Sequence, residues 1–135
     1  MAIWMSFTSL AAGALSPEEL SVYETAHQVV EQAEKAMEQP FQTAFDPQIC
    51  LEQSKTLRAY LKKNRGTASG TFLNILQEEV ALLDRAMDYF KTVGMVRPSL
   101  NALSLTQKQY KAAKMKEDFK TAKKILEKHF QKSSK

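Results

Sequence analysis

Apolar residues recur every three to four positions along four separate stretches of this chain, and that spacing is the period of an α-helix. Runs in which apolar and polar residues alternate, which indicate β-strands, are nearly absent. The sequence therefore predicts an all-α fold. The four predicted helices cover residues 17–39, 47–64, 70–93 and 105–131.

Helix start and stop signals separate these stretches. Ser16 is followed by a proline and, three positions on, by Glu19, which is typical of a capped helix N-terminus closed by a capping box. Asp46 before a second proline repeats the start signal, and Gly94 is typical of a helix end. Because the connections are short, we expect consecutive helices to lie antiparallel, as an up-down-up-down four-helix bundle spanning residues 16–135.

An apolar segment, residues 1–15, precedes the first predicted helix. It contains no lysine or arginine, which the first part of a signal peptide requires. It is also too short, and too often interrupted by serine and threonine, to span a membrane, and no other segment predicts a transmembrane helix. We therefore expect an apolar arm that packs on the bundle of a cytoplasmic protein. Cleavage of residues 1–14 as an export signal is the alternative.

Motifs that indicate catalysis are missing from the sequence. Cys50 is the only cysteine, which excludes an internal disulfide and a cysteine-based zinc site. It lies on the apolar side of the second stretch, where a cysteine behaves as a small hydrophobic residue. The chain has no glycine-rich phosphate motif and no acid/base pair at a diagnostic spacing. We therefore expect a protein that is not an enzyme and that holds no cofactor.

Three residues in the first predicted helix have the spacing found in one half of a di-iron site. Glu24 and His27 lie three positions apart, and Glu31 lies one turn further on. A di-iron site in a helix bundle needs a second Glu-x-x-His motif and two more inward glutamates. The other histidine, His129, follows Glu127 at the wrong spacing, and the expected core positions of the second and third helices carry no carboxylate. The sequence therefore predicts no metal site and places the first three residues at a solvated or helix-facing edge.

Charge is distributed unevenly along the chain. Residues 1–50 contain one lysine and seven acidic residues, a net charge of −6, whereas residues 101–135 contain ten lysines and three acidic residues, a net charge of +7. In the last predicted helix, lysines at every fourth position form a row that we call the lysine ladder. Four residues turn a helix by about 400°, so each lysine is rotated by about 40° from the one before. The ladder consists of Lys116, Lys120, Lys124, Lys128 and Lys132.

The ladder has three alternative partners. The first is internal: the acidic edge of the first helix would lie beside the ladder in the bundle, with Glu24, Glu31 and Glu38 at steps of seven and Glu34 between them. The second is nucleic acid, if a further basic cluster faces the same way as the ladder. The third is an acidic protein or an anionic membrane surface. The further basic cluster consists of Arg58, Lys62, Lys63 and Arg65.

Among these alternatives we expect a non-catalytic helical-bundle protein that binds a protein partner with an acidic surface through the ladder. An adaptor, a chaperone-like protein or an accessory subunit would act in this way. Binding to nucleic acid without sequence preference is the alternative function, and association with further copies of the chain stays open.

Overall fold

The structure of the chain, a computed structural model, describes residues 10–11, 15–39, 44–68, 70–94 and 105–131. It contains the helices α1 (Pro17–Glu38), α2 (Gln48–Lys63), α3 (Gly70–Thr92) and α4 (Leu105–His129). The prediction of an all-α fold is confirmed for these residues. Most of the predicted apolar arm, residues 1–9 and 12–14, and Lys132 of the lysine ladder lie outside the described residues.

The helix ends follow the signals in the sequence. The Ser16 hydroxyl accepts a hydrogen bond from the Glu19 N–H at 3.1 Å, and the Glu19 carboxylate accepts one from the Ser16 N–H at 3.0 Å, which is the predicted capping box. The Asp46 carboxylate accepts a hydrogen bond from the Gln48 N–H at the start of α2. At the end of α3, Gly94 has a φ of +87°, a conformation that glycine adopts without steric cost.

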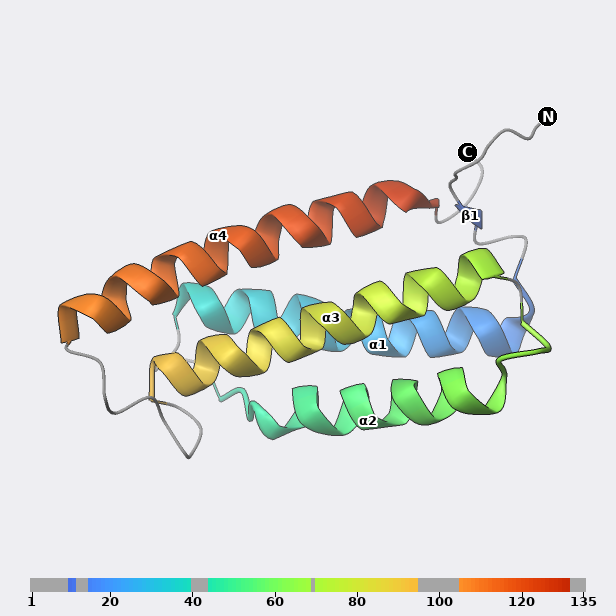
Figure 1. Cartoon of the computed structure of the whole chain (residues 1–135), viewed down its shortest axis with the longest axis horizontal. Helices are drawn as coiled ribbons and strands as arrows, with labels where there is room; N and C mark the ends of the chain where they lie inside the picture. The colour runs from blue at the N-terminus through green and yellow to red at the C-terminus, as the bar shows by residue number, and fades with distance from the viewer. Residues whose placement is uncertain (1–9, 12–14, 40–43, 69, 95–104, 132–135) are drawn as a thin grey trace.

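Helix α3 lies at the centre of the molecule and packs against α1, α2 and α4 (Figure 1). Helices α2 and α4 lie on opposite sides of the α1–α3 pair (Figure 1). Large apolar side chains from α1, α3 and α4 fill the space between the helices. Burying each such side chain contributes about 1.5–3 kcal/mol to folding. No described helix is long and apolar enough to cross a membrane. The bulkiest fully buried apolar side chains include Tyr23, Met37, Phe72, Phe90 and Phe119.

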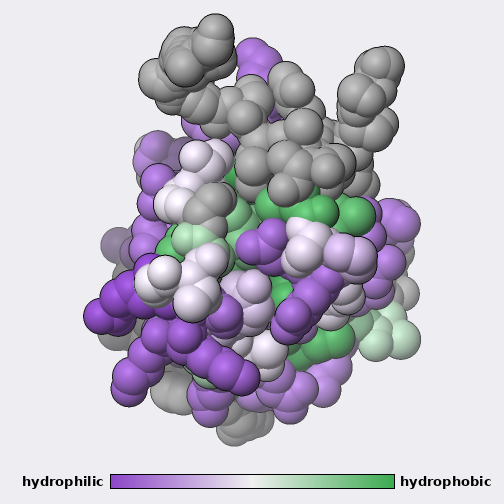
Figure 2. All heavy atoms as spheres, turned by 90° about the vertical axis from the view of Figure 1, so that its right-hand side faces the viewer, coloured by the Kyte–Doolittle hydropathy of each residue, from purple (hydrophilic) through white to green (hydrophobic). Residues whose placement is uncertain are grey.

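Two short strands join the two ends of the described chain. Strand β1 (Leu10–Ala11) pairs in parallel with β2 (Phe130–Gln131). Helix α4 ends at His129, two residues before the approximate end predicted from the sequence, and the backbone beyond it bonds to β1. The Phe130 ring is 2% exposed and stacks on Tyr23 at 3.7 Å between ring centroids, which holds this end of the chain on the bundle. Figure 2 looks onto this end and shows hydrophobic residues among hydrophilic ones.

Candidate functional site

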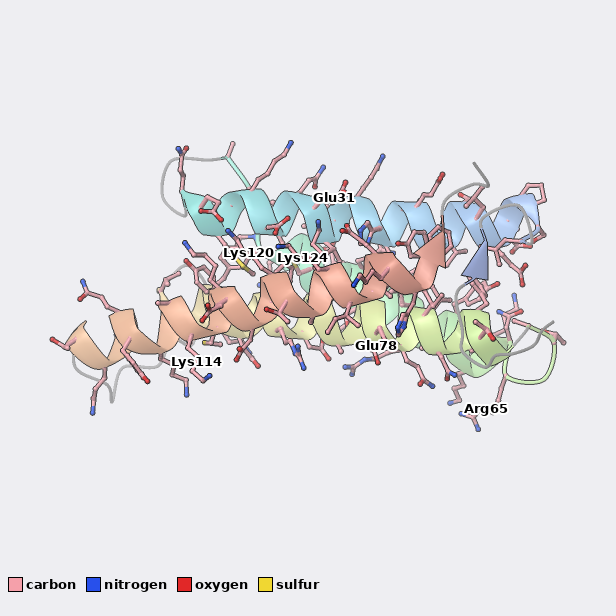
Figure 3. The ribbon with its side chains drawn as sticks, turned by 90° about the horizontal axis from the view of Figure 1, so that it is seen from above. Glu31, Arg65, Glu78, Lys114, Lys120 and Lys124 are labelled. Atoms are coloured by element: carbon pink, nitrogen blue, oxygen red, sulfur yellow. The ribbon has the colours of Figure 1, made fainter. Side chains whose placement is uncertain are left out.

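The four described lysines of the ladder form two pairs with different surroundings. Lys116 and Lys120 both contact the Glu38 carboxylate at the end of α1, Lys116 at a distance of 3.6 Å. Lys124 is exposed and forms no ion pair within the described part of the chain, and Lys128 is also exposed. Figure 3 shows Lys120 and Lys124 on the side of α4 nearer α1 and Lys114 on the opposite side. The rotation of about 40° per step explains the division, because it carries the row from the α1 side toward solvent.

These contacts set the charge state of Glu38. Its hydrogen bond with Lys120, together with the charge of Lys116, holds the pKa of Glu38 below its usual range. The same hydrogen bond raises the pKa of Lys120. The acidic edge of α1 therefore binds Lys116 and Lys120 of the ladder, so these two lysines are not available to another molecule.

The second basic cluster lies away from the ladder. Arg58, Lys62 and Lys63 belong to α2, which lies on the opposite side of the α1–α3 pair from α4 (Figure 1). The Arg58 guanidinium donates a hydrogen bond to Asp84 of α3, and Arg65 lies at the end of the bundle toward the α2–α3 connection (Figure 3). Among the described residues, the two basic clusters therefore do not form one continuous surface.

A chain of polar groups crosses the interior between α3, α1 and α4. His27 is 5% exposed and lies between two carboxylates: its Nδ1 is 2.8 Å from Glu79 Oε2, and its Nε2 is 2.7 Å from Glu127 Oε2. Lys123 extends the chain, with its ammonium 2.9 Å from Glu127 and 3.1 Å from Glu34. We call these five residues the buried polar network.

The two short contacts of His27 require one proton more than a neutral imidazole and two ionised carboxylates carry. A neutral imidazole has one N–H and one lone pair, so it cannot donate to two carboxylates. Both ring nitrogens of His27 face an oxygen, and therefore either the imidazole is an imidazolium or one of the two carboxyls is protonated. Glu79 binds His27 through Oε2. Its other carboxylate oxygen, Oε1, has no hydrogen-bond partner among the described residues, although Glu79 is fully buried.

Burial and charge act against each other in the network. Burial raises the pKa of Glu79, and the hydrogen bond with His27 only partly offsets this effect. Burial alone would lower the pKa of His27, but the hydrogen bonds and charges of Glu79 and Glu127 outweigh it and raise that pKa. Burial would likewise raise the pKa of Glu127, yet His27 and Lys123 lower it overall. The two raised pKa values both favour a proton held between Glu79 and His27.

One expectation from the sequence is wrong at this site. The core positions of α3 were expected to carry no carboxylate, but Glu79 is among them. Its position gives the signal that was missed, because Phe72, Glu79 and Ala86 follow one another at intervals of seven and all three are buried. His27 was expected at a solvated or a helix-facing edge, and the second alternative holds, because its buried ring lies between α3 and α4.

The fold also assembles a group of metal-ligating atoms from two helices. His27, Glu31 and Glu127 each bring one such atom to within 4.8 Å of the others. Glu31 is exposed, Glu127 is half-buried, and Glu24, which the sequence pattern paired with His27, is exposed. The useful neighbour of His27 is therefore Glu127, one hundred residues away, and not the glutamate three positions before it.

Cys50 is buried at 0% exposure, as the sequence pattern predicts. Burial raises the pKa of its thiol to about 12. Because the thiolate is the nucleophilic form, this thiol is unreactive at neutral pH while the protein is folded.

Comparison with known proteins gives no relative from which to argue. No protein-family model matches the chain, and no curated sequence and no solved structure matches it significantly.

Proposed function

We propose that this chain is an up-down-up-down four-helix bundle that binds another protein and catalyses no reaction. An adaptor, a chaperone-like protein or an accessory subunit acts in this way. The direction of the helices in Figure 1, which alternates from α1 to α4, supports the bundle topology. The exposed side of α4 supports the binding role.

The proposed docking surface is the outer face of α4. Its members recur at steps of three and four, so they lie in one row along about 27 Å of helix. Tyr110 is 75% exposed and Ile125 is 52% exposed, and no other described large hydrophobic residue is as exposed as these two. The outer face consists of Tyr110, Lys114, Glu117, Thr121, Lys124, Ile125 and Lys128, all of which are exposed.

The chemistry of this face indicates the partner. Exposed aromatic and aliphatic residues are typical of the centre of a protein interface, and charged residues surround them at the rim. Lys124 lies beside Ile125 and has no acidic partner in the described chain, so an acidic surface with an apolar patch complements it. Ile125 also lines a groove of about 540 Å³ between α3 and α4, which a side chain of the partner could enter.

The same face gives less support to nucleic-acid binding. Glu117 lies in the row, and Lys116 and Lys120 already contact Glu38. A phosphate backbone requires several lysines that are free to neutralise it. The protein partner is therefore the better explanation of the exposed Tyr110 and Ile125.

The test is affinity purification from the native host with the full chain as bait, followed by calorimetry with the purified partner. A double variant of the outer face, Lys124→Glu with Ile125→Ser, should bind that partner at least about tenfold more weakly. Lys62→Glu on α2 is the matched control, because Lys62 is also exposed but lies on the other side of the bundle. The control should bind normally, and neither variant should lower the melting temperature.

Two results would overturn the proposal. One is a partner that binds the double variant as tightly as the native chain. The other is binding to any DNA duplex whose log affinity falls linearly and steeply with log salt, which would establish the nucleic-acid alternative.

A further inference from the structure

The buried polar network and its exposed neighbour Glu31 together have the ligands and the charge of a metal site. We propose that His27 Nε2 and the carboxylates of Glu31 and Glu127 bind one divalent transition-metal ion of the zinc class. This inference is independent of the protein-binding role proposed above.

The positions of the three ligand atoms suit such an ion. They lie within 4.8 Å of one another, and a tetrahedral zinc ion with bonds of about 2.0–2.1 Å holds its ligand atoms roughly 3.3 Å apart. The difference is small enough for side-chain rotation to close, since Glu31 is exposed and Glu127 is half-buried. The Nε2–Oε2 distance of 2.7 Å between His27 and Glu127 would lengthen slightly as the ion replaces the proton between them.

Glu79 supplies a second, independent indication. A histidine that binds a metal usually donates its other N–H to a carboxylate, which fixes the tautomer and the orientation of the ring. Glu79 occupies that place, 2.8 Å from Nδ1 of His27, which leaves Nε2, 2.7 Å from Glu127 Oε2, to bind the ion. Glu79 is fully buried with an unpartnered Oε1, an arrangement that destabilises a fold unless something compensates for it. A dication bound to the same imidazole would be that compensation.

The local excess of negative charge supports the same conclusion. Glu79 and Glu127 both contact the His27 ring, and the ligand atom of Glu31 lies within 4.8 Å of those of His27 and Glu127. The positive groups in this region are His27, when it is protonated, and Lys123. A divalent cation would reduce the repulsion among the acidic groups.

The surroundings of the imidazole favour a preformed site. The Tyr23 ring stacks on the His27 ring with centroids 5.2 Å apart, and Phe130 stacks on the other side of Tyr23. These rings limit rotation of the imidazole and exclude water from one side of it. Three protein ligands leave a fourth position for water. A mixture of imidazole and carboxylate suits zinc, iron and manganese ions better than magnesium or calcium, which prefer oxygen alone.

The test uses the full-length protein after removal of metal with EDTA. Titration with Co²⁺, a visible-light probe for zinc sites, should give an absorption band that saturates at one ion per chain, and Zn²⁺ should displace it. Zn²⁺ should raise the melting temperature, whereas Mg²⁺ should not. Absence of the cobalt band, or displacement of Co²⁺ by Mg²⁺ as readily as by Zn²⁺, would overturn the proposal.

Single variants test whether the ion binds at the three proposed ligands or non-specifically to acidic residues on the surface. Glu31→Gln should weaken Zn²⁺ binding at least about tenfold, with no loss of stability in EDTA because Glu31 is exposed. Glu24→Gln, on the same helix and also exposed, is the matched control and should bind normally. Lys123→Met should bind Zn²⁺ more tightly, since it removes a competing cation 2.9 Å from Glu127. Equal affinities for the native chain and Glu31→Gln would show that the ion binds elsewhere.

Glu79 acts as a positioning residue and is tested separately. Glu79→Gln should weaken Zn²⁺ binding about 10–100-fold, the usual effect of losing such a partner. The wavelength of the cobalt band should change little because the three ligands stay the same. An unchanged Zn²⁺ affinity in this variant would show that Glu79 does not position the imidazole for metal binding.

Discussion

The two sets of charged contacts made by α4 differ in burial, although both join it to α1. In the first set, Lys116 and Lys120 contact Glu38 in a partly exposed position. In the second set, Lys123 contacts the buried polar network, which ends at Glu79, a residue with no exposed surface. The first belongs to a regular lysine row that is obvious in the sequence, whereas the second depends on contacts between residues far apart in the sequence, such as His27 and Glu79.

Burial decides how much each set of contacts matters. Exposed ion pairs are weakened by water and salt and contribute little to stability. A buried carboxylate is different, because losing its partner leaves an uncompensated polar group in the interior. We therefore expect substitutions in the buried polar network to have large effects and substitutions in the ladder to have small ones.

The strongest test of this comparison is His27→Leu in metal-free buffer. The substitution leaves Glu79 buried without its hydrogen-bond partner, so the free energy of unfolding should fall by about 3–5 kcal/mol. Urea denaturation followed by circular dichroism measures it.

The double variant His27→Leu with Glu79→Met is the control for that experiment. It replaces both buried polar groups with apolar ones, and such a replacement is often neutral or stabilising. It should therefore recover most of the lost stability. If the double variant is no more stable than His27→Leu alone, then packing of the imidazole and not the stranded carboxylate causes the loss.

An intermediate effect is expected at Lys123, where the two regions meet. Its side chain is 12% exposed and lies between Glu34 and Glu127. Lys123→Met keeps the apolar stem but removes the charge, so it should lower the free energy of unfolding by about 1 kcal/mol in metal-free buffer. Lys124→Met is the matched control, because Lys124 is exposed and unpaired in the described chain. A similar loss in both variants would contradict the role of the Lys123 contacts.

The fold was largely predictable because its signals are local. The capping box of Ser16 and Glu19 and the glycine at position 94 act within a few residues of the helix ends that they fix. The drift of the lysine ladder is also local, since it follows from helix geometry alone. Which end of the ladder would meet α1 was not predictable, because that depends on how α4 crosses the other helices.

The buried polar network could not be assembled from the sequence for the same reason. His27 and Glu79 lie 52 residues apart, and their contact depends on the rotation of both helices about their axes. One glutamate in the apolar row of α3 indicates an unusual core position but does not name its partner. The expectation of an acidic edge on α1 was closer, since Glu34 and Glu38 do contact lysines of α4.

The smallest effect in this comparison belongs to Glu38 and depends on pH. Lys120 and Lys116 lower the pKa of Glu38 from its ordinary value of 4.5, so ionised Glu38 stabilises the folded state. This contribution is present above the ordinary pKa and is lost as the pH falls through the lowered one. The native chain should therefore be slightly more stable than Glu38→Gln at pH 7, and the difference should vanish in acid. Urea denaturation of both chains at a series of pH values measures it. A difference that persisted in acid would show that Glu38 acts through packing and not through its charge.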